Sequence, residues 1–234
     1  MKKIFKILVL SVAGIFLLKA PGLATVLTYG DIYKNWPGQT VTHGANQDEI
    51  GTPTIAKAAV EVSGDAANPG QLESVTIYMS DRRVWDSLFI STGGPWDSWD
   101  YIVYDSDDGA SSGHDTYDKT APASDGLYSV SSGYSYEYVD HPYGRTGHVN
   151  GINADHLSLV SSFEPVWDSA AGTLTYDFSN LNITVNSDFA VGYTPWCAND
   201  VFLTPVPEPV TMLLLGIGLL GIACVSCRQF FIRA

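Results

Sequence analysis

Hydrophobic and polar residues alternate with a period of two through the middle of the chain, a pattern typical of strands with one buried face. Over residues 72–79, Val75, Ile77 and Met79 would lie on one face and the intervening side chains on the other. Residues 55–62 form a similar segment, although their alanines also permit a helix. Further strands are predicted at residues 84–90, 99–104, 127–139, 157–162, 174–178, 181–185 and 189–193.

Segments rich in Gly, Ser, Asp and Asn separate these strands and predict loops. Residues 91–95 are typical of a hairpin connection, and residues 105–125 and 141–153 predict two long loops. The rhythm of strands and crossover helices that a parallel sheet needs is not visible. The pattern therefore predicts a single all-β domain over residues 25–204, a two-sheet β-sandwich with a jelly roll as one variant.

The first 24 residues have the composition of an export signal. Lys2, Lys3 and Lys6 form a positive segment, and residues 7–18 form an apolar one. Small residues then precede the predicted signal-peptidase site, which follows Ala24. We predict a signal peptide over residues 1–24 and passage through the general export machinery. An uncleaved signal anchor is the alternative.

A second apolar segment, at residues 210–227, predicts a transmembrane helix. It is 18 residues long and apolar on every side, whereas a helix at the surface of a soluble core would have a polar stripe. Pro207 and Pro209 mark where the helix begins, and Arg228 and Arg233 follow it on the side expected to stay in the cytoplasm. A simple C-terminal anchor would explain the helix by itself.

The order of these parts is more specific than an anchor requires. Pro207-Glu208-Pro209, then a Leu- and Gly-rich span, then Arg228 and Arg233 resembles the PEP-CTERM sorting signal, here over residues 205–234. The two arginines are a thin basic cluster for this family. The resemblance implies processing by exosortase, a membrane-bound transpeptidase-like enzyme of Gram-negative bacteria that make exopolysaccharide. It also implies transient anchoring in the inner membrane, followed by the cell surface or the extracellular matrix.

Charge is distributed unevenly along the chain, whose formal net charge is −13. Residues 25–204 hold six of the 12 Lys and Arg and 24 of the 25 Asp and Glu, so this part carries −18. Such a surface would repel nucleic acid and anionic lipid and attract cations or basic partners. Cys197 is the one cysteine in this part, so an internal disulfide is excluded. We expect a buried thiol, with pairing to another chain as the alternative.

Motifs of common catalytic machinery are missing from the sequence, including the nucleophile elbow, the zinc-protease helix, the phosphate loop and the dinucleotide fingerprint. We therefore expect a non-enzymatic surface or matrix protein, associated with exopolysaccharide. A secreted carbohydrate-active hydrolase that uses Asp or Glu is the alternative, and two carboxylates converging in a cleft would indicate it. Ice binding is a further alternative, but the flat repeated Thr array of an ice-binding face is not evident.

An acidic segment is the candidate calcium site. Asp105, Asp107 and Asp108 precede Gly109, and closely spaced carboxylates beside a sharp turn can supply hard oxygen ligands to Ca²⁺. The match to an EF-hand loop is poor, because Thr116 stands where the bidentate Glu would fall. A solvated acidic loop is the alternative.

Repeated Trp-Asp pairs are the candidate carbohydrate site. Trp96-Asp97 and Trp99-Asp100 flank a predicted turn, so we expect them to be exposed, with indole faces for sugar rings and carboxylates for hydroxyls. The same pair at Trp85 and Trp167 is expected in the core. The five histidines are more consistent with single loop residues than with a metal site; they are His43, His114, His141, His148 and His156.

Overall fold

The described part of the chain is built from β-strands. A computed structural model describes residues 24–32, 36, 51–65, 67–82, 86–94, 98–105, 124–139, 147–195 and 197–204. Over these residues it has fourteen strands and one 3₁₀ turn, η1 (Ala154–His156), and it contains no α-helix. The strands are β1 (Thr25–Gly30), β2 (Ile55–Val62), β3 (Gly70–Met79), β4 (Asp86–Ser91), β5 (Tyr101–Asp105), β6 (Gly126–Val130), β7 (Tyr136–Tyr138), β8 (Val149–Ile152), β9 (Leu157–Ser161), β10 (Val166–Asp168), β11 (Thr173–Asp177), β12 (Thr184–Val185), β13 (Ala190–Pro195) and β14 (Phe202–Leu203). The all-β prediction is confirmed.

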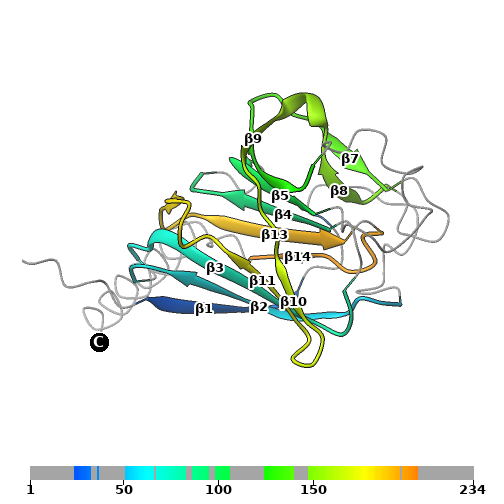
Figure 1. Cartoon of the computed structure of the whole chain (residues 1–234), viewed down its shortest axis with the longest axis horizontal. Coiled ribbons are helices and arrows are strands. Elements are labelled where there is room, and N and C mark those ends of the chain that lie inside the picture. The colour runs from blue at the N-terminus through cyan, green and yellow to red at the C-terminus, as the bar shows by residue number, and fades with distance from the viewer. Residues whose placement is uncertain are drawn as a thin grey trace, which may run out of the picture.

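Two six-stranded sheets lie face to face (Figure 1). The first has the order β1-β2-β3-β11-β10, with β12 also paired to β3, and the second has the order β14-β13-β4-β5-β6-β9. The strand pairs in both sheets are antiparallel. In the second sheet β13 returns to lie beside the meander β4–β6, as in a Greek key. A jelly roll needs two Greek keys, and the described strands form this one.

The main core lies between the two sheets. Val75, Ile77 and Met79 of β3 point into it, as their alternation predicted. They meet side chains of the second sheet such as Leu88 and Val191. The polar or aromatic positions between them on β3 are partly exposed, so the outer face of the first sheet is its solvent side.

The centre of the second sheet, in contrast, is covered on both faces. Every residue of β4 and of β13 is buried. The outer face of this sheet contributes Phe89 to a second core, which is closed by Trp36 and by the two-stranded ribbon β7-β8 (Figure 1). The sequence predicts alternation at residues 189–193 but not this third layer, because buried small and polar residues such as Gly192 and Thr194 do not resemble a core face.

Several predicted boundaries are wrong for local reasons. Residues 149–152 of the predicted loop 141–153 form β8, whose two large apolar side chains lie three positions apart and show no alternation. The predicted strand at residues 127–139 is two strands, separated by a turn at Gly133 with φ +78°. Asn182, with φ 52°, leaves only residues 184–185 of the predicted strand 181–185. Strands β1, β10 and β14 were not predicted.

The predicted signal peptide and transmembrane helix lie outside the described residues, apart from Ala24. Within the residues that the structure describes, no helix is long and apolar enough to cross a membrane. Strand β1 begins at Thr25, the residue after the predicted cleavage site. The signal peptide and its cleavage after Ala24 stay predictions.

Candidate functional site

A charged cluster is buried at one end of the sandwich, formed by Arg82, Asp86 and Asp105. Asp86 and Asp105 are directly opposite each other on the paired strands β4 and β5, and Arg82 follows β3. The Arg82 guanidinium donates to Asp105 and lies 3.7 Å from Oδ2 of Asp86. The Asp86 side chain is 0% exposed and that of Asp105 4% exposed.

Two tyrosines complete this cluster. Tyr176 of β11 donates its hydroxyl to Oδ1 of Asp86 at 3.0 Å, and Tyr193 of β13 donates to Oδ2 at 3.1 Å. The cluster therefore connects the two sheets through one carboxylate. Burial raises the pKa of both phenols well above the normal value, as does the neighbouring Asp86, so both hydroxyls remain proton donors.

The protonation of Asp86 is set mainly by burial. Loss of solvent raises the pKa of this carboxyl to about 7, and the charge of Asp105 adds to the rise. The Arg82 guanidinium and the two tyrosine hydroxyls act in the opposite direction. Burial by itself would lower the pKa of Arg82, but the two carboxylates outweigh it and raise that pKa. Asp86 is therefore a carboxyl that gains its charge near neutral pH.

Two carboxylates thus converge, which is the feature that would distinguish a hydrolase. A glycosidase pair, however, must flank a sugar bond and reach a water molecule. Asp86 has both oxygens engaged by tyrosine hydroxyls and has no exposed surface. The arrangement is a buried cluster in which Arg82 pairs with Asp105 while Asp86 accepts hydrogen bonds from two tyrosines. Sequence reasoning missed it, since neither Asp86 nor Arg82 belongs to a motif.

Of the three residues of the candidate calcium site, the structure describes one, Asp105. Asp107 and Asp108 lie outside them. Asp105 is the last residue of β5 and its carboxylate is directed at Arg82. Within the described residues no group of three or more metal-ligating side chains occurs. Calcium binding at this segment stays a prediction.

The expected exposure of Trp99 is wrong, while Trp96 and Asp97 lie outside the described residues. Trp99 is 3% exposed, and its indole N–H donates to the hydroxyl of Tyr136 at 2.8 Å. The neighbouring Asp100 is half-buried and accepts hydrogen bonds from the backbone and hydroxyl of Thr92, both at 2.7 Å. A large aromatic side chain beside a turn gains more from covering the sheet face than from water. The turn itself is confirmed, because β4 and β5 pair as a hairpin.

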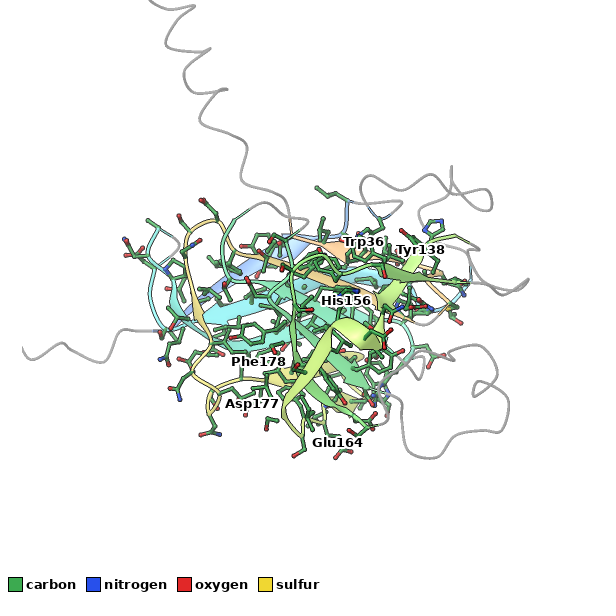
Figure 2. All side chains as sticks on the ribbon, turned by 90° about the horizontal axis from the view of Figure 1, so that it is seen from above. Trp36, Tyr138, His156, Glu164, Asp177 and Phe178 are labelled. Carbon is green, nitrogen blue, oxygen red and sulfur yellow. The ribbon has the colours of Figure 1, made fainter. Side chains whose placement is uncertain are left out.

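The most exposed aromatic side chain of the described residues, Tyr138, lies in a row of three tyrosines, Tyr134, Tyr136 and Tyr138, which we call the tyrosine strip. Their alternation predicts a strand, but the sequence gives no sign that they form a surface. Successive rings are 5.5 and 6.4 Å apart, in edge-to-face geometry. Tyr136 contacts the buried Trp36, with ring centroids 6.2 Å apart, whereas Tyr138 is 45% exposed; Trp36 and Tyr138 are labelled in Figure 2. Ring faces and edges at its outer end are available to a ligand.

The remaining candidates are structural where they are described. Cys197 is buried, as expected. Trp167 is half-buried against the main core, whereas Trp85 lies outside the described residues. His148 is fully buried, and His156 ends the 3₁₀ turn. His43, His114 and His141 lie outside the described residues.

The described chain leaves the sandwich at Thr204, directly before the predicted sorting signal. Thr204 is 1% exposed, its N–H donates to the carbonyl of Val191 at 2.8 Å, and its hydroxyl accepts from the Val191 N–H at 3.0 Å. It thus extends the pairing of β14 with β13 by one residue. Pro205 follows, and a proline cannot donate a further ladder bond. The residues of the signal itself, from Pro207 to Arg233, lie outside the described part.

Comparison with known proteins identifies this tail. The family model of the PEP-CTERM protein-sorting motif matches residues 205–229, so the resemblance seen in the sequence is confirmed. The motif implies export and membrane-associated processing by an exosortase-type enzyme. No curated protein and no solved structure matches the chain.

Proposed function

We propose that the protein is a non-enzymatic surface or matrix protein, delivered by exosortase-type processing of its tail and associated with exopolysaccharide. The observation that carries delivery is the match of residues 205–229 to the sorting motif. The motif begins directly after Thr204, which is buried and is the last residue of the described part, and this position at the end of the sandwich supports a tail that can be recognised as a peptide.

A binding role for the domain is supported by its chemistry. The carboxyls that converge, Asp86 and Asp105, are engaged within the fold, Asp105 by the Arg82 guanidinium and Asp86 by the hydroxyls of Tyr176 and Tyr193. The tyrosine strip offers neighbouring aromatic rings that suit a sugar, where Tyr134 and Tyr136 lie behind the exposed Tyr138. A sugar ring can stack on an aromatic face there without any catalytic group. The strong negative charge of residues 25–204 favours a neutral polysaccharide over an anionic one.

Mass spectrometry of the C-terminus tests delivery. We expect a mature C-terminus upstream of Ala234 in cells that contain the sorting enzyme, and an intact tail in cells that lack it. Detection of Ala234 as the terminal residue in both strains would overturn the proposal.

Pull-down with the exopolysaccharide of the host tests binding. We expect Tyr138→Ala to reduce the amount of protein retained several-fold, since the most exposed ring of the strip is lost. Tyr78→Ala is the matched control, because Tyr78 lies on the outer face of the first sheet. Equal retention of the two variants and of the unchanged protein would remove the tyrosine strip as the sugar site.

A further inference from the structure

The two points where the described chain enters and leaves the sandwich lie at the same end. In the first sheet, Thr25 is paired with Val62, which in turn is paired with Leu72 near the start of β3. In the second sheet, Thr204 is bonded to Val191, one residue from the start of β13. Both positions therefore lie at the ends of their sheets.

A turn shows that these two sheet ends are the same end of the molecule. Val185 of β12 is paired with Gly70, the first residue of β3. The next residue, Asn186, donates its N–H to the carbonyl of Thr92 at 2.9 Å, and Thr92 directly follows β4. We call this surface the exit end: Thr25, Thr204 and the turns at residues 67–69, 92–94 and 186–189. The charged cluster lies at the opposite end, beyond Met79.

The sorting motif is held close to the exit end. Only Pro205 and Val206 separate the buried Thr204 from Pro207, and three residues span at most about 11 Å. By comparison, strand β3 alone, with its 10 residues, is roughly 30 Å long. The site of any enzyme that binds Pro207-Glu208-Pro209 must therefore lie close to the exit end.

We propose that the exit end of the sandwich is the surface that meets the membrane-bound processing enzyme. This inference rests on the proposed delivery by the tail. The occupant is a protein rather than the lipid surface, because the two basic residues in the described part of the chain, Lys57 and Arg82, are both near the opposite end. The exit end instead presents exposed Asp188 and half-buried Asp100, which anionic lipid would repel.

Photo-crosslinking of the full chain in its host tests this surface. A photoreactive phenylalanine analogue replaces Ser187, which is exposed in the turn at residues 186–189, and in a second version replaces Ala170. Ala170 is also exposed, but its turn lies beside Met79 at the opposite end. We expect a crosslink to the epitope-tagged processing enzyme from position 187, at least several-fold above that from position 170.

A variant with a longer linker between the domain and the tail is the second part of the experiment. About 20 Gly and Ser residues inserted between Thr204 and Pro205 would move the tail away by roughly 25 Å on average. We expect the crosslink from position 187 to disappear while the tail is still processed. Equal crosslinking from both positions, lipid adducts alone, or no enzyme adduct while the tail is processed would overturn the inference. Failure of the tail to be processed in the unchanged protein would instead overturn the delivery proposal, and mass spectrometry of the C-terminus separates the two cases.

Discussion

The substitution Asp86→Asn should change how the stability of the domain depends on pH. Asp86 is fully buried between Tyr176, Tyr193 and Arg82, and its pKa is raised to about 7 from 3.8. Asparagine has nearly the same shape but no charge to gain, and Arg82 keeps Asp105 as its partner. Comparing the variant with the unchanged protein therefore measures how much the ionisation of one buried carboxyl lowers the free energy of unfolding.

The direction of the change in stability follows from the pKa of Asp86 in the folded and in the unfolded protein. Below about pH 4 both the folded and the unfolded protein hold the proton, so ionisation costs nothing. Between about pH 4 and pH 7 the unfolded chain loses the proton while the folded protein keeps it, so the free energy of unfolding falls. The shift of about 3 pKa units corresponds to roughly 4 kcal/mol at about 1.36 kcal/mol per unit. Above pH 7 both states are ionised and the difference is constant.

Urea unfolding of the full chain in mild non-ionic detergent measures this effect, with tryptophan fluorescence as the signal. Trp36 and Trp99 are buried in the second core and should report its exposure. The difference between the unchanged protein and Asp86→Asn cancels the other carboxyls to first order. We expect the unchanged protein to lose roughly 4 kcal/mol relative to the variant from pH 4 to pH 7. A difference that stays constant over this interval, or that grows in favour of the unchanged protein, would refute the reasoning.

Further predictions concern the core and the surface. Gly192→Ala should lower the free energy of unfolding by about 1–3 kcal/mol, because an added Cβ would lie 2.7 Å from Cη2 of Trp36; Gly30→Ala, which meets nothing within 4 Å, is the control in the same urea titration. Trp36→Ala should cost about 3–5 kcal/mol, since this side chain closes the second core against Phe89 at 4.8 Å between ring centroids; a loss below about 1 kcal/mol would mean that the third layer contributes little. Asp177→Asn should reduce stability in full above about pH 4 and by less at lower pH, because the hydroxyl and N–H of Ser179 lower the pKa of Asp177 and this contribution is lost as the pH falls through the lowered value; an equal effect at pH 3 and pH 7 would contradict it.

The position of Trp99 shows where prediction from the sequence failed. A Trp-Asp pair beside a turn resembles a sugar-binding surface, but the sequence does not show that a second core covers the outer face of the second sheet. That face is completed by Trp36 and by Val149 of β8, which are distant from Trp99 along the chain. The tyrosine strip was recognised only as a strand for the same reason.

By itself the sequence determined the features that depend on residues close together along the chain. Period-two alternation identifies strands such as β3, and Pro207-Glu208-Pro209 with the apolar segment after it identifies the sorting motif, since the enzyme that recognises such a tail recognises a linear peptide. The tertiary structure alone decided which groups meet across the sheets. Asp86 and Asp105 share Arg82 because β4 and β5 pair in one register, and Thr25 lies at the same end as Thr204 because of the strand order. Burial, and with it the pKa of Asp86, follows from these long-range contacts, which a linear pattern does not contain.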